Sequence, residues 1–202
     1  MHSEIVGGPS IAVKPYEIRW HGRGGQGSIT AAKIVARAAH LMGYKGVTAT
    51  PSFGAERRGA PVSASTRISP KPIMVVSQVE EPDAVVVLDQ TLLKYEEVIS
   101  GLNHRGWLVV NSKQHPGELS IKGDFNIATA DATAVCSELG LIVAGLIVVN
   151  TAILGAFVCA TEIVDVPSIE KIVRERFSDS AADVNLRAIM KTYEITKLEK
   201  RQ

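Results

Sequence analysis

The chain has 202 residues, of which 46% are hydrophobic and 21% are charged, a composition typical of one globular domain with a substantial core. The formal net charge is only +1 and aromatic residues make up 5%, which argues against nonspecific nucleic-acid binding and against a surface that stacks bases. The two cysteines, Cys136 and Cys159, are too few for an iron–sulfur cluster held by this chain alone. Their apolar surroundings predict buried, inert thiols of a reducing compartment.

The first part of the chain predicts a strand, a glycine-rich turn, a helix and a second strand. Residues 16–20 alternate between apolar and polar side chains, and a turn at 21–27 leads into a helix over 28–42 whose apolar residues share one face. A second strand is expected at 45–50. This order is that of a βαβ unit, so we expect an α/β fold, a single three-layer Rossmann-like domain with a mostly parallel sheet.

Residues 1–15 contain glycine and proline without periodicity and are expected to form an N-terminal arm, with one domain over residues 16–202. Further strands and helices are expected to complete the sheet and cover it. These are a hairpin of residues 62–68 with 73–76, a strand buried on both faces at 84–88, a helix at 91–100, strands at 107–111 and 125–128, and helices at 130–139, 167–177 and 181–200.

The stretch from Leu139 to Ala160 has no charged residue and is long enough to cross a bilayer. Gly140, Gly145 and Asn150 interrupt it, and no basic cluster flanks it, so we interpret it as a buried core helix that touches a partner subunit. The start of the chain lacks the features of a secretory signal, and a cytoplasmic location is expected. No histidines have metal-ligand spacing, and no metal site is expected.

The loop after the first strand matches the pattern G-x-G-x-x-G and lies between a strand and a helix, which is the context of a phosphate-binding turn. Its candidate binding residues are Gly22, Arg23, Gly24, Gly25, Gln26, Gly27 and Ser28. A nicotinamide or flavin site would need a carboxylate after the second strand, and none occurs before Glu56. An ATP-hydrolysing loop would need Lys followed by Ser or Thr, where Ser28-Ile29 stands instead. The alternative is a tight turn that only packs the helix closely.

The loop after the second strand, residues 53–61, is expected to leave the same edge of the sheet as the glycine loop. Glu56, Arg57 and Arg58 could grip a carboxylate, a phosphate or a neighbouring subunit. The alternative is a charged loop that is simply solvated.

Four motifs in this order resemble the gamma subunit, or gamma domain, of the pyruvate/2-oxoacid:ferredoxin oxidoreductase family. They are residues 17–27, residues 53–61, residues 82–89 and the segment Asn150-Thr151-Ala152-Ile153-Leu154-Gly155-Ala156. Together they place nearly the whole chain beyond residue 15 within the resemblance.

The resemblance implies a multisubunit enzyme that decarboxylates a 2-oxoacid oxidatively on thiamine diphosphate with Mg, passes electrons through iron–sulfur clusters to ferredoxin or a similar acceptor, and transfers the acyl group to coenzyme A (CoA). Alpha, beta and delta-type subunits would hold the thiamine and the clusters, and this chain would catalyse nothing alone. It implies a CoA phosphate contact at the glycine loop, and an interface or active-site edge at Glu56, Arg57, Arg58 and Asn150.

Two other functions stay open on the sequence: a free-standing nucleotide- or dinucleotide-binding module, and a purely structural scaffold subunit. The substrate also stays open, with pyruvate the first expectation and an aromatic 2-oxoacid such as phenylglyoxylate the alternative.

Overall fold

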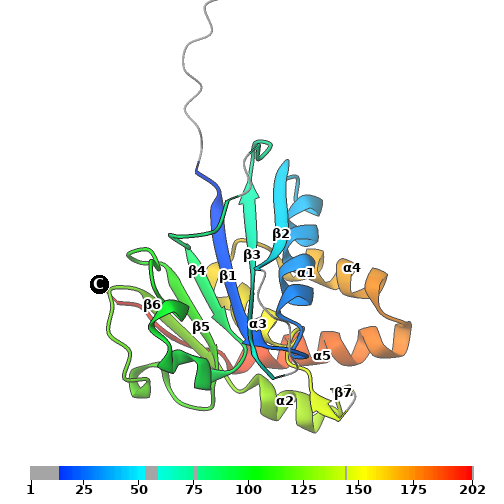
Figure 1. Ribbon diagram of the computed structural model, residues 1–202. Helices are drawn as coiled ribbons and strands as arrows, with labels where there is room; N and C mark the ends of the chain where they lie inside the picture. The colour runs from blue at the N-terminus through cyan, green and yellow to red at the C-terminus, as the bar shows by residue number, and fades with distance from the viewer. Residues whose placement is uncertain (1–13, 53–58, 75–76, 144, 202) are drawn as a thin grey trace, which may run out of the picture.

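The computed structural model describes residues 14–52, 59–74, 77–143 and 145–201. Within these ranges, seven strands form one sheet, two short strands form a separate hairpin, and five α-helices and three 3₁₀-helices pack beside them (Figure 1). In chain order the elements are β1 (Tyr16–Arg23), α1 (Ser28–Leu41), β2 (Gly46–Ser52), β3 (Pro61–Ser69), β4 (Ala84–Val87), η1 (Gln90–Lys94), η2 (Glu96–Val98), β5 (Trp107–Asn111), η3 (Pro116–Glu118), β6 (Asn126–Ala130), α2 (Ala132–Glu138), β7 (Ile142–Val143), β8 (Leu146–Ile147), α3 (Ile153–Thr161), α4 (Val166–Arg176), α5 (Asp179–Ile195) and β9 (Lys197–Glu199).

The sheet has the strand order β2-β3-β1-β4-β5-β6-β9. Strands β1, β4, β5 and β6 are parallel neighbours, and β2 runs in their direction because both β1 and β2 pair antiparallel with β3. The predicted α/β class and mostly parallel sheet are therefore confirmed. The predicted βαβ unit is split, because β3 lies between its two strands.

The predicted hairpin of residues 62–68 with 73–76 is wrong. Both hydrogen-bonding edges of β3 are used, one by β1 and the other by β2, so no edge remains for a third strand. Ile73 instead packs against Gly46 at the start of β2, and residues 75–76 lie outside the described residues.

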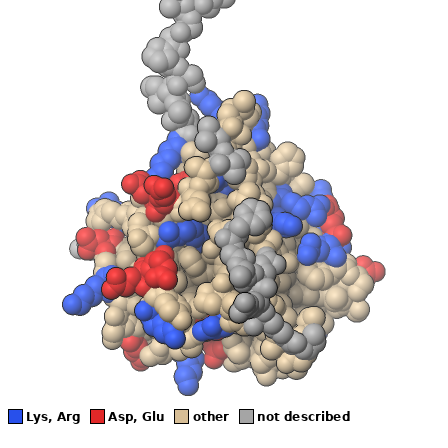
Figure 2. Space-filling view, viewed as in Figure 1, with Lys and Arg blue, Asp and Glu red and all other residues tan. Residues whose placement is uncertain are grey.

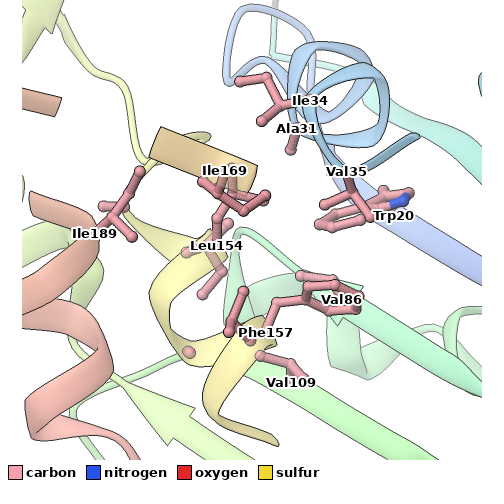
Figure 3. Close-up of a cluster of buried hydrophobic side chains, with 14 of the residues drawn as sticks. Trp20, Ala31, Ile34, Val35, Val86, Val109, Leu154, Phe157, Ile169 and Ile189 are labelled. Atoms are coloured by element: carbon pink, nitrogen blue, oxygen red, sulfur yellow. The ribbon is translucent and has the colours of Figure 1, made fainter. Parts of the chain in front are cut away.

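The α-helices cover one face of the sheet, and the main core lies between this face and the helices (Figures 1 and 3). Figure 3 shows Leu154 and Phe157 of α3 inside this core, between the strand residue Val86 and the α5 residue Ile189. The rings of Phe157 and Trp20 stack at a tilt, with centroids 5.2 Å apart. Such a pair contributes about 1 kcal/mol beyond its area burial and ties α3 to β1.

The other face is covered differently. Over β4 and β5 a second apolar cluster includes Leu92 and Val98. These residues belong to η1 and η2, so the predicted helix at 91–100 is wrong in type: it is two 3₁₀-helices. The second outer layer of the predicted three-layer domain is thus made of 3₁₀-helices and loops. Arg19 on β1 also faces this side and donates to the carbonyls of Val98 and Ser100.

The uncharged stretch 139–160 is not one helix, which corrects the prediction. Its first part forms the β7–β8 hairpin, with Val143 opposite Leu146, and only its second part is helical as α3. Gly140 and Gly145 both have positive φ, a conformation that ends a helix and permits a tight hairpin turn. No helix within the described ranges is both long and apolar enough to cross a membrane.

Helix α3 approaches α5 very closely at Gly155. A Cβ on this residue would lie 2.1 Å from the carbonyl oxygen of Ile189 and 2.6 Å from the amide nitrogen of Tyr193. Only glycine lets the two helix backbones come this near. The glycine therefore determines how deeply α3 sits between the sheet and α5.

The C-terminal helix is shorter than predicted. Helix α5 ends at Ile195 rather than near residue 200, and β9 follows and pairs antiparallel with β6, with Leu198 opposite Ala128. Pairing with the otherwise free edge of β6 satisfies backbone groups that a longer helix would leave at the sheet edge.

Both cysteines are free thiols, one in α2 and one in α3. Cys136 is buried as predicted, and burial raises its pKa to about 12. Cys159 is only half-buried, and its pKa is raised first by burial and then by the charge of Glu162. The predicted inertness of the thiols stays a prediction for Cys159.

We expect Gly155→Ala to lower the free energy of unfolding by about 1–3 kcal/mol because the added methyl group overpacks the α3–α5 contact. This sign is opposite to the stabilisation of about 1 kcal/mol that the same change brings in an ordinary helix interior. Thermal and denaturant unfolding would measure it. Gly43→Asn is the control, since nothing lies within 4 Å of Gly43 and asparagine tolerates its positive φ. Stabilisation by Gly155→Ala would refute the close-packing argument.

Candidate functional site

The glycine loop joins β1 to α1 at the edge of the sheet where the parallel strands end. Strand β1 continues further than predicted, so Gly22 and Arg23 belong to it and pair with β3, and the turn itself is short. Gly25 and Gly27 have φ of 95° and 81°, which favours glycine at both positions. The amide of Gln26 donates to the carbonyl of Arg23 at 2.9 Å, and its side-chain Oε1 accepts from the Arg23 amide at 2.7 Å.

Arg23 is anchored within the chain. Its Nε donates to Oδ2 of Asp89 at 2.7 Å, Nη2 donates to the hydroxyl of Thr91 at 2.8 Å, and Nη1 donates to the carbonyl of Gly59 at 3.1 Å. Partial burial of Asp89 acts to raise its pKa, but hydrogen bonds from Thr91 and Arg23 outweigh it and the pKa is lowered. The ion pair thus holds the end of β1 to the end of β4.

The second predicted loop meets the glycine loop at its described end. The amide of Gly24 donates to the carbonyl of Ala60 at 2.8 Å, and the carbonyl of Gly24 accepts from the amide of Gly59 at 3.1 Å. Strands β1 and β2 end at the same edge, as predicted. The three charged candidates Glu56, Arg57 and Arg58 lie outside the described residues.

Asn150 lies directly against the glycine loop although it is more than 120 positions away in sequence. A Cβ on Gly27 would lie 2.4 Å from Nδ2 of Asn150. The β7–β8 hairpin meets the same loop, since a Cβ on Gly25 would lie 3.3 Å from a methyl carbon of Leu146. The site therefore combines the first and the last of the four sequence motifs.

The N-terminus of α1 opens toward this loop. The first amides of a helix lack intrahelical partners and carry the positive end of the helix dipole. Gly27 at the N-cap has no side chain to cap this end, and within the described part of the chain no acidic residue occurs in the first turn of α1. The hydroxyl of Ser28 is buried and has no hydrogen-bond partner among the described atoms. Gly25, at the tip of the turn, is exposed to solvent. The loop thus offers free amides beside an exposed glycine, which is the chemistry of an anion site.

The topology also favours a site here. The chain leaves β1 toward β2 on one side and later returns to β4 on the other, so β1 and β4 form the switch point where ligands bind in open α/β sheets. A dinucleotide would need a carboxylate at the end of a parallel neighbour of β1 to hold a ribose. The parallel neighbour is β4, and Asp89 at its end is already bound by Arg23.

His21 lies on β1 just before the loop. Burial, and then the positive charge of Arg19, lower the pKa of His21 to about 4. Its Nε2 is buried without a hydrogen-bond partner among the described atoms. The imidazole is therefore neutral at physiological pH.

Sequence reasoning missed Asp89 and Thr91 as partners of Arg23, and Leu146 as a wall of the loop. Asp89 could have been found, since it directly follows a fully buried strand whose carboxyl end shares the edge with the glycine loop. Leu146 gave no local signal, because it was part of a stretch read as one helix.

Across the described ranges, no three His, Cys, Asp or Glu side chains come together as a possible metal site. On the face shown in Figure 2, acidic and basic side chains of the described residues are interspersed rather than gathered by sign. Among the described residues, the loop offers backbone amides and the side chain of Arg23, which is already paired with Asp89.

The fold and the loop define a Rossmann-like α/β domain with a glycine-rich site at its switch point. The sequence matches the family Pyruvate ferredoxin/flavodoxin oxidoreductase over residues 17–195. It is 47% identical over 185 residues to the pyruvate/ketoisovalerate oxidoreductases common subunit gamma of Pyrococcus furiosus, covering 90% of this chain and 97% of that one. The chain belongs to this family, and the resemblance predicted from its motifs is confirmed.

Solved structures are also similar to this chain. The pyruvate oxidoreductase subunit PorC of Thermotoga maritima matches with a TM-score of 0.80 and 36% identity, covering 93% of this chain and all of that one. A 2-oxoglutarate:ferredoxin oxidoreductase of Magnetococcus marinus, with 2-oxoglutarate, CoA and succinyl-CoA bound, matches with a TM-score of 0.68 but 18% identity, over 31% of its length. That likeness concerns the fold alone.

We expect the thermal midpoint to fall as pH decreases from about 6.5 to about 4, in part because of His21. In this window the unfolded chain binds a proton that the folded chain does not, so stability is lost as the pH falls. Above it both states are neutral and the contribution is fully present. His21→Gln should show a smaller fall than the wild type, and His104→Gln, at an exposed histidine, should show the wild-type fall. Equal falls in all three proteins would contradict the assignment.

Proposed function

We propose that the chain is the gamma subunit of a 2-oxoacid:ferredoxin oxidoreductase, with pyruvate as the first candidate substrate. The observation that carries the proposal is the glycine loop at the switch point, in a chain that spans nearly the full length of gamma-type relatives. The relatives' names favour pyruvate and ketoisovalerate. They favour a subunit over a free-standing nucleotide-binding module. An aromatic substrate such as phenylglyoxylate stays a prediction.

The complex is proposed to use thiamine diphosphate with Mg, iron–sulfur clusters and CoA, in the cytoplasm. When bound, thiamine diphosphate supplies the carbanion chemistry and the clusters carry electrons to ferredoxin or a similar acceptor. The two cysteines are too few for an iron–sulfur cluster, the described residues form no metal-ligating cluster, and the resemblance implies that other subunits hold the thiamine diphosphate. These groups are therefore assigned to alpha, beta and delta-type partners, and no catalytic step is assigned to a side chain of this chain.

CoA, as a substrate, fits the glycine loop better. Its phosphates would meet the free amides at the start of α1 and the exposed backbone of Gly25, where an added side chain would fill the approach. Arg23 contributes mainly by holding the loop, because three of its N–H groups are already engaged with protein oxygens. This chain would bind and orient the coenzyme, and the thiol chemistry would occur on partner subunits.

The interface proposal concerns the surroundings of the loop. The β7–β8 hairpin exposes Ile142 and Val143, the latter with 63% of its surface accessible, and an apolar surface of this kind suits a neighbouring subunit. Arg57 and Arg58 are proposed, from the sequence, to bind the same neighbour or the coenzyme. Changing both to Ala should weaken assembly or raise the KM for CoA.

The assembly is tested by purifying the native particle that contains this chain. Mass analysis should find alpha, beta and delta-type chains with bound thiamine diphosphate and iron, and a screen should show CoA-dependent oxidation of pyruvate or ketoisovalerate. Phenylglyoxylate belongs in the same screen. A chain that purifies alone and binds NAD, FAD or ATP would overturn the proposal.

The CoA contact is tested by Gly25→Asp against Gly25→Asn. Both side chains have nearly the same shape and tolerate a positive φ better than most, so the two variants share the strain at Gly25 and differ in charge and in the hydrogen bonds that the Asn amide can donate. Repulsion of a phosphate at about 5 Å should raise the KM for CoA about tenfold in the Asp variant relative to the Asn variant, with the KM for the 2-oxoacid unchanged. Added salt should reduce the difference. Equal KM values for CoA would count against a phosphate at this loop.

A further inference from the structure

The segment that enters α3 is locked to α5 by a buried polar pair. The Thr151 hydroxyl donates to Oδ1 of Asn185, and Nδ2 of Asn185 donates to the carbonyl of Ala181 at 2.8 Å. Thr151 is fully buried and Asn185 is 7% exposed. Both ends of the Asn185 carboxamide are therefore engaged, and its orientation is fixed by α5.

A hydrogen bond from the backbone of Thr151 connects this polar pair to the residue that contacts the glycine loop. The amide of Thr151 donates to Oδ1 of Asn150 at 2.8 Å, which turns the Asn150 carboxamide so that Nδ2 faces Gly27. The three atoms nearest to a Cβ placed on Gly27 all belong to Asn150: Nδ2 at 2.4 Å, and Cβ and Cγ at 3.0 Å. The Asn150 side chain thus rests on the last residue of the loop, directly before the first amides of α1.

A third contact, at Gly155, also holds this segment to α5. One turn further along, Gly155 packs on the backbone of α5 at Ile189 and Tyr193. Helix α3 is consequently held to α5 at two points, by a hydrogen bond at Thr151 and by close packing at Gly155. Figure 3 shows the neighbouring Leu154 packed into the core between α5 and the sheet. Each polar or glycine position of the motif Asn150-Thr151-Ala152-Ile153-Leu154-Gly155 therefore has a distinct contact.

We propose that Thr151 and Asn185 are positioning residues of the glycine loop, acting through Asn150. Hydrogen bonds join them to each other, to Ala181 and to Asn150. They hold the Asn150 carboxamide against Gly27, which keeps the turn and the first amides of α1 in one arrangement. The consequence for CoA rests on the proposed function, while the consequence for the loop does not.

The physical reason is the cost of an unsatisfied buried group. Thr151→Val keeps the shape of the side chain but removes the hydroxyl, so the buried Oδ1 of Asn185 loses its donor. Either the Asn185 carboxamide must then turn or the segment that precedes α3 must shift. In both cases the contact of Asn150 with Gly27 changes. Thr151→Ser keeps the hydroxyl and serves as the matched control. Asn150→Ala removes the side chain that contacts Gly27, at a half-exposed position. It is the second variant to use if Thr151→Val fails to assemble.

The experiment uses the purified complex and two readouts. The first is amide hydrogen exchange over residues 22–30, and the second is the KM for CoA beside kcat and the KM for the 2-oxoacid. Thr151→Val and Asn150→Ala should both speed exchange in this segment and raise the KM for CoA about fivefold, and in Thr151→Val kcat and the other KM should stay near wild type. Thr151→Ser should match the wild type in both readouts.

The outcomes separate this proposal from the proposed function. Unchanged exchange at residues 22–30 in Thr151→Val and Asn150→Ala overturns the positioning role, even where Gly25→Asp shows that the loop binds CoA. Faster exchange with an unchanged KM for CoA, together with no effect of Gly25→Asp, supports the positioning role and counts against CoA at the loop. Faster exchange in Thr151→Ser equal to that in Thr151→Val also overturns it, because the hydroxyl would then be irrelevant.

Discussion

The rest of the structure depends on how closely the segment of residues 150–155 approaches two other parts of the chain. Asn150 lies against Gly27 of the glycine loop, and Gly155 lies against the backbone of α5. At each of these positions a Cβ would overlap its neighbour, with Asn150 at the first and the backbone of Ile189 at the second. Because no side chain intervenes, α3 sits deep between the sheet and α5, and its entry reaches the loop after β1. The core formed by Phe157, Trp20 and their neighbours is built around α3 in this position.

The same constraint also shapes the candidate site. The loop is held from three sides: by Arg23 to Asp89 at the end of β4, by Gly24 to Ala60 after β2, and by Asn150 from the start of α3. Among the described residues, nothing engages the start of α1 or the exposed backbone at Gly25. Such preorganised amides bind an anion without further rearrangement. This suits a subunit that orients a substrate for chemistry performed by its partners.

Much of the fold could be predicted because its signals are local. The β5 bounds at Trp107–Asn111 and the start of α1 at Ser28 agree with the predictions, since a buried apolar run and a glycine before an amphipathic helix are read from adjacent residues. The antiparallel β3 was assigned to the wrong partner because alternation identifies a strand but not its neighbours. The β7–β8 hairpin was missed because an apolar stretch does not distinguish helix from strand, although Gly140 and Gly145 marked its limits.

The candidate site was predictable in its glycines and not in its supports. The spacing from Gly22 to Gly27 pointed to the loop, whereas its contacts with Asp89, Leu146 and Asn150 depend on tertiary packing. The most direct measurement is a structure of the whole purified complex with CoA bound. The account predicts a coenzyme phosphate within hydrogen-bonding distance of the backbone amides between Gly25 and Ser28. A map in which CoA is fully ordered with all its phosphates on other chains would contradict it.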